Sequence, residues 1–261
     1  NTVCRVRTPT SANAGGIATA TVRTVDMYWN LNISSAVTLD SDTSDPNDTE
    51  PAGTLQILPL VTGSTVYHFS PVTAGTHTVN IRDTSEVVSP STSAVFTVNG
   101  RSATRLLVLL PGETLNKGKS PYAAGGSPAN ETGGKDGTPD GEAGAEQFIA
   151  GRTYKLTVYA TDDNWNPDAS YNGGASLSST DTYASNLGAK NLINGTTTFD
   201  FTLYTAVDYN GTGYKLTMTT SALDNPSYIT PLINFKPNTL TKLRMRGPGE
   251  SRLPGTTAGK Y

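Results

Sequence analysis

Short stretches in which apolar and polar residues alternate recur along the chain. One such stretch places Tyr154, Leu156, Val158 and Ala160 on one side of an extended backbone, opposite Lys155, Thr157, Tyr159 and Thr161. Another places Phe199, Phe201 and Leu203 opposite Thr198, Asp200 and Thr202. Alternation with a period of two is typical of a strand that buries one face. The pattern therefore predicts an all-β protein.

The chain also contains an internal repeat. The stretch TVRTVDMYWN, which ends at Asn30, matches TVYATDDNWN, which ends at Asn166. The stretch GSTVYHFSPVTA from Gly63 matches GTTTFDFTLYTA from Gly195. Because the matching stretches follow one another in the same order, the same set of strands is expected twice.

These matches divide the chain into three segments. Repeat one spans residues 1–100, and repeat two spans 101–238 with a Gly-rich insertion over 112–147. Residues 239–261 open a third repeat, because LTKLRMRGPGE in this segment matches ATRLLVLLPGE at the start of repeat two. We interpret this last segment as an opening strand or as a tail that links subunits.

Composition narrows the fold and the class of protein. Hydrophobic residues make up 35% of the chain and charged residues 16%, with 26 Gly and 16 Pro. About seven short strands per repeat with so few apolar residues predict two antiparallel β-sandwiches in tandem, since each sheet fills the core with one face. A net charge of -3 argues against nucleic-acid binding. No apolar run is long enough to span a membrane.

The tandem units, the V-x-x-x-D-x-x-W-N turn and the G-T/S-x-x-F/Y-x-F strand carry a family resemblance. The chain resembles the bacterial immunoglobulin-like (Big/invasin-type) tandem repeats of large extracellular surface or fibre proteins. This resemblance implies an immunoglobulin-like fold and an extracellular or cell-surface location. It implies function only broadly, because such repeats serve as stalks, fibres, surface-layer components and adhesins.

One run of oxygen-bearing side chains is a candidate calcium site. It consists of Asp162, Asn164, Asn166 and Asp168 at alternate positions, and calcium takes six to eight oxygen ligands. The rest of the helix–loop–helix calcium pattern is missing, since Pro167 stands where its glycine would be. The favoured interpretation is a tight turn in which Asp and Asn side chains cap backbone amides. No other cofactor is expected.

Catalytic chemistry is not expected. The two histidines, His68 and His77, are not kept between the repeats, because Asp200 and Tyr214 replace them. The chain shows no paired nucleophile and base. We therefore predict that the protein is not an enzyme.

The insertion over residues 112–147 departs from a minimal repeat. Its composition is rich in Gly, Ser, Asn and Asp, and repeat one spans the same gap with about five residues, Pro9 to Asn13. A loop of this length is usually functional or disordered. A solvated loop, a loop packed on a neighbouring subunit and a ligand-binding loop all remain open.

Basic residues mark the first strand of repeat one and the tail. Cys4-Arg5-Val6-Arg7 aligns with Leu243-Arg244-Met245-Arg246, and Lys242 precedes the second of these runs. Arg5, Arg7, Lys242, Arg244 and Arg246 would lie on the outward face of the strand. They serve either to prevent edge-to-edge aggregation or to face an acidic neighbour, such as the stretch from Asp42 to Glu50.

The alignment of the two ends leads to a functional prediction. Leu243 and Met245 need a core to enter, because an isolated strand is unstable in water. Either the protein continues into a third repeat, or the tail completes a sheet in another copy of the chain. We predict a structural extracellular protein, a subunit or repeat segment of a filament, pilus-like fibre or surface layer that assembles head to tail. The alternative is an adhesin or carbohydrate-binding stalk module.

Overall fold

The computed structural model describes residues 9–33, 38–48, 56–59, 63–84, 88–122, 132–141, 147–207 and 213–260. Within these ranges the backbone forms strands, bridges, turns and bends and no helix. The predicted all-β class is confirmed. The described part of the chain accordingly holds no helix of the length and hydropathy needed to cross a membrane.

Contacts group the chain into two compact units. Unit 1 comprises Asn1–Arg101 together with Lys117–Lys119, and unit 2 comprises Ser102–Asn116 together with Ser120–Tyr261. The division after Arg101 falls beside the boundary expected from the repeat. Residues 239–260, which the sequence assigns to a third repeat, belong with unit 2 by their contacts.

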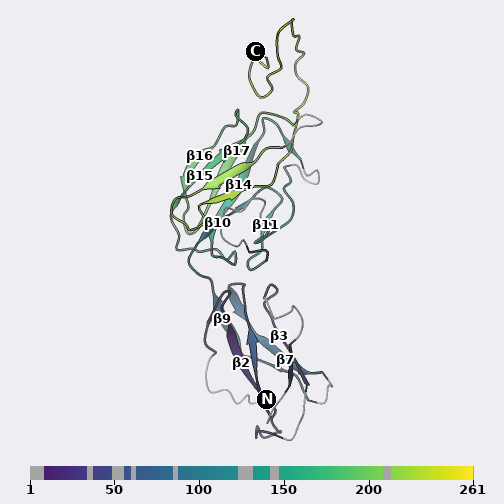
Figure 1. The fold of residues 1–261 in the computed structure, drawn as a ribbon, viewed down its shortest axis with the longest axis vertical. Helices are drawn as coiled ribbons and strands as arrows, with labels where there is room; N and C mark the ends of the chain where they lie inside the picture. The colour runs from purple at the N-terminus through teal and green to yellow at the C-terminus, as the bar shows by residue number, and fades with distance from the viewer. Residues whose placement is uncertain are drawn as a thin grey trace. The chain divides into compact units, whose positions relative to one another are not determined.

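The strands of unit 1 form three small sheets (Figure 1). The strands are β1 (Ala12–Asn13), β2 (Ala18–Arg23), β3 (Thr38–Thr43), β4 (Gln56–Pro59), β5 (Ser64–Phe69), β6 (Gly75–His77), β7 (Val79–Asp83), β8 (Ser91–Thr92) and β9 (Phe96–Asn99). Their orders are β4-β3-β7-β8, β2-β5 and β1-β9-β6. The pair β1–β9 is parallel and all the others are antiparallel.

Unit 2 repeats this arrangement with additions. Its strands are β10 (Arg105–Leu109), β11 (Thr114–Leu115), β12 (Lys135–Asp136), β13 (Phe148–Ile149), β14 (Thr153–Thr161), β15 (Gly174–Ser179), β16 (Gly188–Asn191), β17 (Thr196–Thr202), β18 (Leu216–Thr219), β19 (Ser227–Ile229) and β20 (Phe235–Lys236). The sheets are β16-β15-β18-β19, β10-β14-β17, β13-β20 and β11-β12.

The two units therefore share one topology. The four-stranded sheet of unit 2 has the order of the one in unit 1, and the antiparallel pair β14–β17 corresponds to β2–β5. The parallel pair β13–β20 likewise corresponds to β1–β9. The hairpin β11–β12, which lies in the insertion, has no counterpart among the described residues of unit 1.

The predicted strand faces are confirmed in both units. Leu156, Val158 and Ala160 on β14 are fully buried and pack in one core with Phe199 and Phe201 of β17. The opposite sheet contributes Ala175, Leu177, Leu216, Met218 and Tyr228 to the same core. In unit 1, side chains from β3, β5, β7 and β9 form the corresponding core. Each unit is thus a sandwich of two sheets around an apolar interior.

The predicted opening strand of the third repeat is not formed. Residues 237–247 make no ladder, and Leu243 and Met245 are 96% and 87% exposed. Their counterparts on β10, Leu106 and Val108, are each 1% exposed, because β10 pairs with β14 and its side chains pack in the core of unit 2. The physical reason for the difference is that residues 239–246 have no partner strand among the described residues.

Candidate assembly site

A turn with the same geometry follows the first long strand in each unit. We call residues 26–30 and 162–166 the Trp turns. In unit 1 the Oδ1 atom of Asp26 accepts hydrogen bonds from the backbone amides of Tyr28 and Asn30, both at 2.8 Å. In unit 2 the Oδ1 atom of Asp162 accepts from the amides of Asn164 and Asn166, both at 2.9 Å. The Asp side chain caps the turn in both cases.

The capping places a tryptophan in an unusual backbone conformation. Trp29 has φ 70° and Trp165 has φ 64°, in the left-handed region that residues other than glycine rarely adopt. The backbone amide of each tryptophan donates a hydrogen bond to the backbone carbonyl of the capping aspartate. The distance is 3.0 Å from Trp29 to Asp26 and 3.1 Å from Trp165 to Asp162. Asp, Trp and Asn at matching positions therefore encode one rigid turn twice.

The candidate calcium ligands Asp162 and Asp168 accept hydrogen bonds from backbone amides in this geometry. The carboxylate of Asp162 is fully buried. It accepts hydrogen bonds from the backbone amide of Asn164 and from the side-chain Nδ2 of Asn166. Asp168 accepts from the amides of Ala103 and Ser170 at 2.8 and 2.9 Å. Burial raises the pKa of Asp168, but the Ser170 and Ala103 hydrogen bonds outweigh it and hold the pKa below its ordinary value.

The four residues thus form the amide-capped turn that the sequence favoured. No three His, Cys, Asp or Glu side chains gather into a potential metal site in the ranges that the structure describes. Calcium binding at Asp162, Asn164, Asn166 and Asp168 stays the alternative hypothesis, which the melting experiment in the Discussion tests.

The two Trp turns differ in what covers them. Trp29 is 55% exposed, whereas Trp165 is completely buried. The guanidinium of Arg105 lies 4.9 Å from the centroid of the Trp165 ring, and the indole Nε1 donates to the carbonyl of Pro121 at 2.9 Å. Unit 2 therefore supplies its own cover for the turn, and part of that cover comes from the insertion.

The hairpin β11–β12 is the central part of this cover. A Cβ atom on Gly134 would lie 2.6 Å from Cγ of Trp165, so only glycine allows the hairpin to approach the ring this closely. The hairpin is tied by an ion pair between Lys135 Nζ and Glu113 Oε1 at 2.8 Å, with both side chains buried. Thus Thr114–Asn116 and Gly133–Asp136 pack on their own unit. A wholly solvated insertion therefore does not describe these residues.

The tail forms a hairpin of the same design. We define the tail hairpin as residues 247–260. Glu250 Oε2 accepts a hydrogen bond from the backbone amide of Gly247, and Glu113 Oε2 accepts the equivalent bond from Leu110. Lys260 forms an ion pair with Glu250, as Lys135 does with Glu113. The bridge Arg252↔Lys260 corresponds to Leu115↔Lys135.

The backbone of the tail hairpin follows its counterpart closely. The amide of Leu253 donates to Gly259 at 2.9 Å, as that of Asn116 donates to Gly134 at 2.8 Å. Gly255 and Gly259 have φ of 82° and 71°, against 77° and 74° for Gly118 and Gly134. Sequence reasoning matched this segment only as far as Glu250. The missed signal was the Gly-Lys pair at 134–135 and again at 259–260.

Each unit contains a threonine platform against which a glycine of positive φ packs. Gly118 and its neighbours Lys117 and Lys119 group with unit 1 by their contacts. In unit 1, Asp45 Oδ2 accepts from the amides of Val72 and Thr73, and a Cβ on Gly118 would meet Thr73 Oγ1 at 2.2 Å. In unit 2, Asp181 Oδ2 accepts from the amides of Tyr204 and Thr205. A Cβ on Gly255 would there meet Thr205 Oγ1, also at 2.2 Å. The same contact is therefore built twice.

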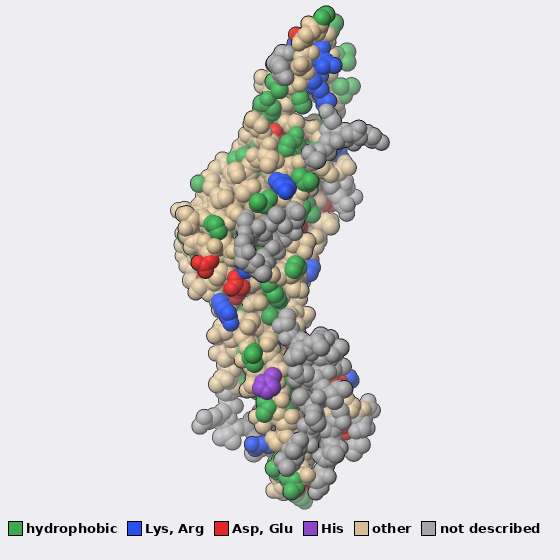
Figure 2. All heavy atoms as spheres, viewed as in Figure 1, with side chains coloured by type: hydrophobic (Ala, Val, Ile, Leu, Met, Phe, Trp, Pro, Cys, Tyr) green, Lys and Arg blue, Asp and Glu red, His purple; other side chains and the backbone are tan. Residues whose placement is uncertain are grey.

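The predicted basic residues divide between described and undescribed parts of the chain. Arg5 and Arg7 lie outside the described residues, as do Cys4 and Glu50. Lys242, Arg244 and Arg246 are exposed on the tail, where Figure 2 shows blue side chains beside green apolar ones. Arg244 donates to the carbonyl of Gly259 within the tail. In the acidic stretch, Asp45 is buried beneath its platform and does not face solvent.

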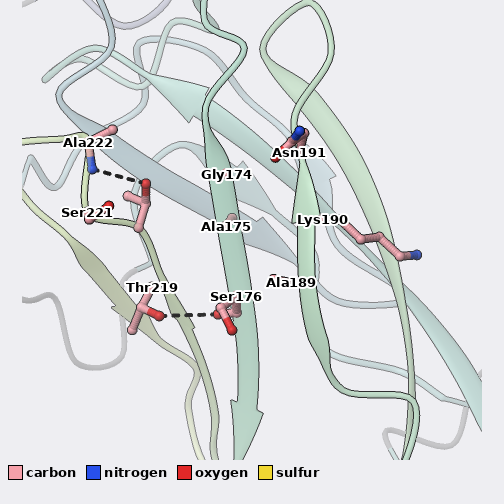
Figure 3. Close-up of a pocket in the computed structure, with 10 residues that line it drawn as sticks. Gly174, Ala175, Ser176, Ala189, Lys190, Asn191, Thr219, Ser221 and Ala222 are labelled. Atoms are coloured by element: carbon pink, nitrogen blue, oxygen red, sulfur yellow. Dashed lines mark hydrogen bonds between the residues drawn. The ribbon is translucent and has the colours of Figure 1, made fainter.

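One shallow hollow lies on the four-stranded sheet of unit 2 (Figure 3). Its volume is about 650 Å³, and it is lined by Gly174, Ala175, Ser176, Ala189, Lys190, Asn191, Thr219, Thr220, Ser221 and Ala222. Thr219 donates across it to the Ser176 carbonyl at 3.4 Å, and Lys190 donates to Thr198 at 2.9 Å. None of the ten lining residues is aromatic, so it lacks the ring platform typical of glycan sites.

Comparison with known proteins gives similar structures but no family. No family model matches the chain, and no curated protein matches it. Among solved structures, a 282-residue C-terminal fragment of intimin, in complex with the intimin-binding domain of its translocated receptor, is 16% identical. That match covers 87% of this chain and 61% of the fragment, with a TM-score of 0.27.

Two further structures illustrate the range of similar proteins. Domains 5–6 of the S-layer protein SbsC are 17% identical, with 88% of this chain and 95% of that chain covered and a TM-score of 0.27. Bacteroides uniformis β-glucuronidase 3 is 8% identical. That match covers 87% of this chain and 24% of the enzyme, with a TM-score of 0.30. All three TM-scores lie below 0.5, so the all-β assignment rests on the strand pairing itself.

Proposed function

We propose that the protein is a structural extracellular repeat protein, part of a filament, fibre or surface layer, whose units are joined by the opening segment of the following repeat. The observation that carries this proposal is the duplicated platform. Thr73 in unit 1 and Thr205 in unit 2 each pack against a glycine of positive φ, Gly118 and Gly255, in the same way. A contact that recurs once per repeat is what an end-to-end array requires.

The exposed part of the tail supports assembly beyond one copy. Leu243 and Met245 are almost fully exposed although they align with core residues of β10. A segment whose amides make no ladder and whose apolar side chains alternate is suited to adding a strand to a sheet in another unit. Because head and tail differ, such a contact is heterologous and propagates into an open filament.

A second function, adhesion, is favoured by one observation. Tyr28 and Trp29 are 74% and 55% exposed on unit 1, and exposed aromatic rings are common platforms for sugars. A glycan array distinguishes the two proposals. Specific binding that is lost in the Tyr28→Ala variant would favour the adhesin, and an array without specific binding would favour the structural role.

Deletion of the tail tests the structural proposal. The full chain and a variant that lacks residues 239–261 are compared by electron microscopy and sedimentation. Leu243→Asp combined with Met245→Asp is a second variant of full length. Ile193→Asp is the control, since Ile193 is an apolar residue of unit 2 that is 69% exposed. The full chain and the control should assemble, and both tail variants should not. Filaments that persist without the tail would contradict the proposal.

A further inference from the structure

The loop around each Trp turn has the same backbone frame. A bridge closes the base of the loop in both units, Val25↔Leu31 in unit 1 and Thr161↔Pro167 in unit 2. The capping hydrogen bonds match as well, and both tryptophans have a positive φ. Because the frames match, the contacts made on Trp165 show which kind of segment fits on Trp29.

In unit 2 the indole of Trp165 is packed against main chain. A Cβ atom on Gly134 would lie 2.6 Å from Cγ of the ring, and one on Gly133 would lie 2.6 Å from Nε1. The Nε1 atom donates a hydrogen bond to the carbonyl of Pro121 at 2.9 Å. Only a segment with glycines at the contact approaches the ring this closely, and a carbonyl satisfies the buried indole N–H.

In unit 1 the same ring is open. Trp29 is 55% exposed, and its Nε1 donates no hydrogen bond to any residue that the structure describes. The hairpin β11–β12 has no counterpart in repeat one, because the stretch from Pro9 to Asn13 takes the place of the insertion. The ring face and the indole N–H that are covered in unit 2 are therefore available to another molecule in unit 1.

The rim of the open turn is apolar. Met27 and Tyr28, which are 82% and 74% exposed, stand where unit 2 has Asp163 and Asn164. In unit 2, Asp163 pairs with the guanidinium of Arg105 at 2.7 Å. Exposed apolar side chains that gather at one place mark an interaction surface. A partner of unit 1 therefore meets Met27 and Tyr28 with apolar side chains, where Asp163 meets a cation.

We propose that the Trp29 turn is a docking surface for a β-hairpin of another protein, one that carries glycine at the point of contact. The glycine main chain lies against the indole, a carbonyl of the hairpin accepts from Nε1, and apolar side chains pack on Met27 and Tyr28. The hydrogen bonds to Asp26 fix the turn before binding, which lowers the cost of ordering it. This surface lies outside the tail, so the inference goes beyond the proposed assembly and can fail independently of it.

A graft tests whether the surface accepts such a hairpin. In the full chain, residues 112–147 replace Thr10–Ser11, which supplies the hairpin within the same molecule at high effective concentration. The graft is in register, since β1 pairs with β9 as β13 pairs with β20. The matched control is the same graft with Gly134→Asn. Asparagine tolerates the left-handed conformation, but its Cβ would collide with the ring.

Acrylamide quenching reports on Trp29, because Trp165 is completely buried and gives a constant background. We expect the graft to protect Trp29 from the quencher, to shift its emission to shorter wavelength and to raise the Tm of unit 1. The control graft should leave Trp29 accessible. A first graft that leaves Trp29 accessible, or that lowers the Tm of unit 1, would overturn the inference.

Binding between molecules is measured by fluorescence anisotropy with a labelled synthetic peptide of residues 110–137. The peptide should bind the full chain and Ile17→Asn equally, because Ile17 is 79% exposed on unit 1 but lies outside the turn. Trp29→Asn should bind it at least about tenfold more weakly, as for the loss of a central aromatic anchor. Equal binding by Trp29→Asn would contradict the inference. Protection of Trp29 when the chain is concentrated without peptide would assign the surface to a second copy and would also contradict it.

Discussion

Trp29 and Trp165 occupy the same position of the same Asp-capped turn, yet the first is 55% exposed and the second is completely buried. The turn itself does not cause the difference, because its hydrogen bonds to Asp26 and Asp162 match. The difference comes from a hairpin that repeat two inserts and repeat one lacks. Exposure of one ring is therefore a consequence of which repeat carries the insertion.

The buried ion pair of the covering hairpin should be important for the stability of unit 2. Removing one partner leaves a buried charge without compensation, so Lys135→Met and Glu113→Gln should each lower the free energy of unfolding by about 3 kcal/mol. The double variant should lose less than the two single losses combined. The measurement is chemical denaturation followed by Trp165 emission.

The pair Lys155–Asp200 is the matched control for this experiment. It joins neighbouring strands at 3.9 Å, with side chains that are 65% and 50% exposed. Exposed pairs contribute about 0–1 kcal/mol, so Lys155→Met should have little effect. A loss at Lys135 no greater than the loss at Lys155 would show that the hairpin is not held by its ion pair.

The strands could be predicted from sequence because one physical rule governs them. Leu156 and Val158 alternate with polar neighbours, and burial of one face follows directly. The ion pair between Glu113 and Lys135 could not be predicted in this way. The two residues are far apart in a glycine-rich insertion, whose composition suggests no core. Their burial depends on the packing of the hairpin over Trp165, which is a tertiary contact without a local pattern.

The tail shows a second limit of the sequence pattern. The alternation of Leu243 and Met245 predicts a strand by comparison with β10, but these residues form no strand in the structure. A strand also needs a neighbour for its amides, and alternation in one segment does not say whether that neighbour is present. The exposure of both side chains could therefore not be predicted from the pattern alone.

The capping aspartates should differ in importance between the units. Asp162 is completely buried, and Asp162→Ala leaves the amides of Asn164 and Asn166 without their acceptor. Each buried amide without a partner costs about 1–3 kcal/mol. Asp162→Ala should thus destabilise unit 2 clearly, and Asp26→Ala should affect unit 1 less because water reaches its amides. Calorimetry of both variants checks this order, and the reverse order would contradict it.

Unit 1 should lose stability in acid through Asp26. The hydrogen bonds from the side chain and the amide of Asn30, and then from Tyr28, hold the pKa of Asp26 below its ordinary value of 3.8. A lowered pKa means that the ionised carboxylate stabilises the fold above pH 3.8 and that this contribution disappears as the pH falls through the folded-state pKa.

The variant Asp26→Asn isolates this effect because its side chain does not titrate. The difference in Tm between wild type and variant should be constant at neutral pH and should shrink below pH 3.8. Calorimetric melting of unit 1 at a series of pH values measures it. A difference that remains unchanged down to strongly acidic pH would show that Asp26 is not held ionised by the turn.

Calcium should leave the Tm of unit 2 nearly unchanged. The carboxylates of Asp162 and Asp168 already accept amide hydrogen bonds, so a cation would have to displace them. Melting curves in EDTA and in millimolar calcium test this expectation. A rise of several degrees with calcium that disappears in Asp168→Asn would instead support the calcium site.

Amide hydrogen exchange in the tail tests the central claim, that this segment joins another unit, most directly. The amides of residues 242–246 make no backbone ladder in the single chain, so they should exchange rapidly in dilute solution. At concentrations where the chain assembles, these amides should become protected from exchange. Rapid exchange of residues 242–246 in fully assembled material would contradict the account.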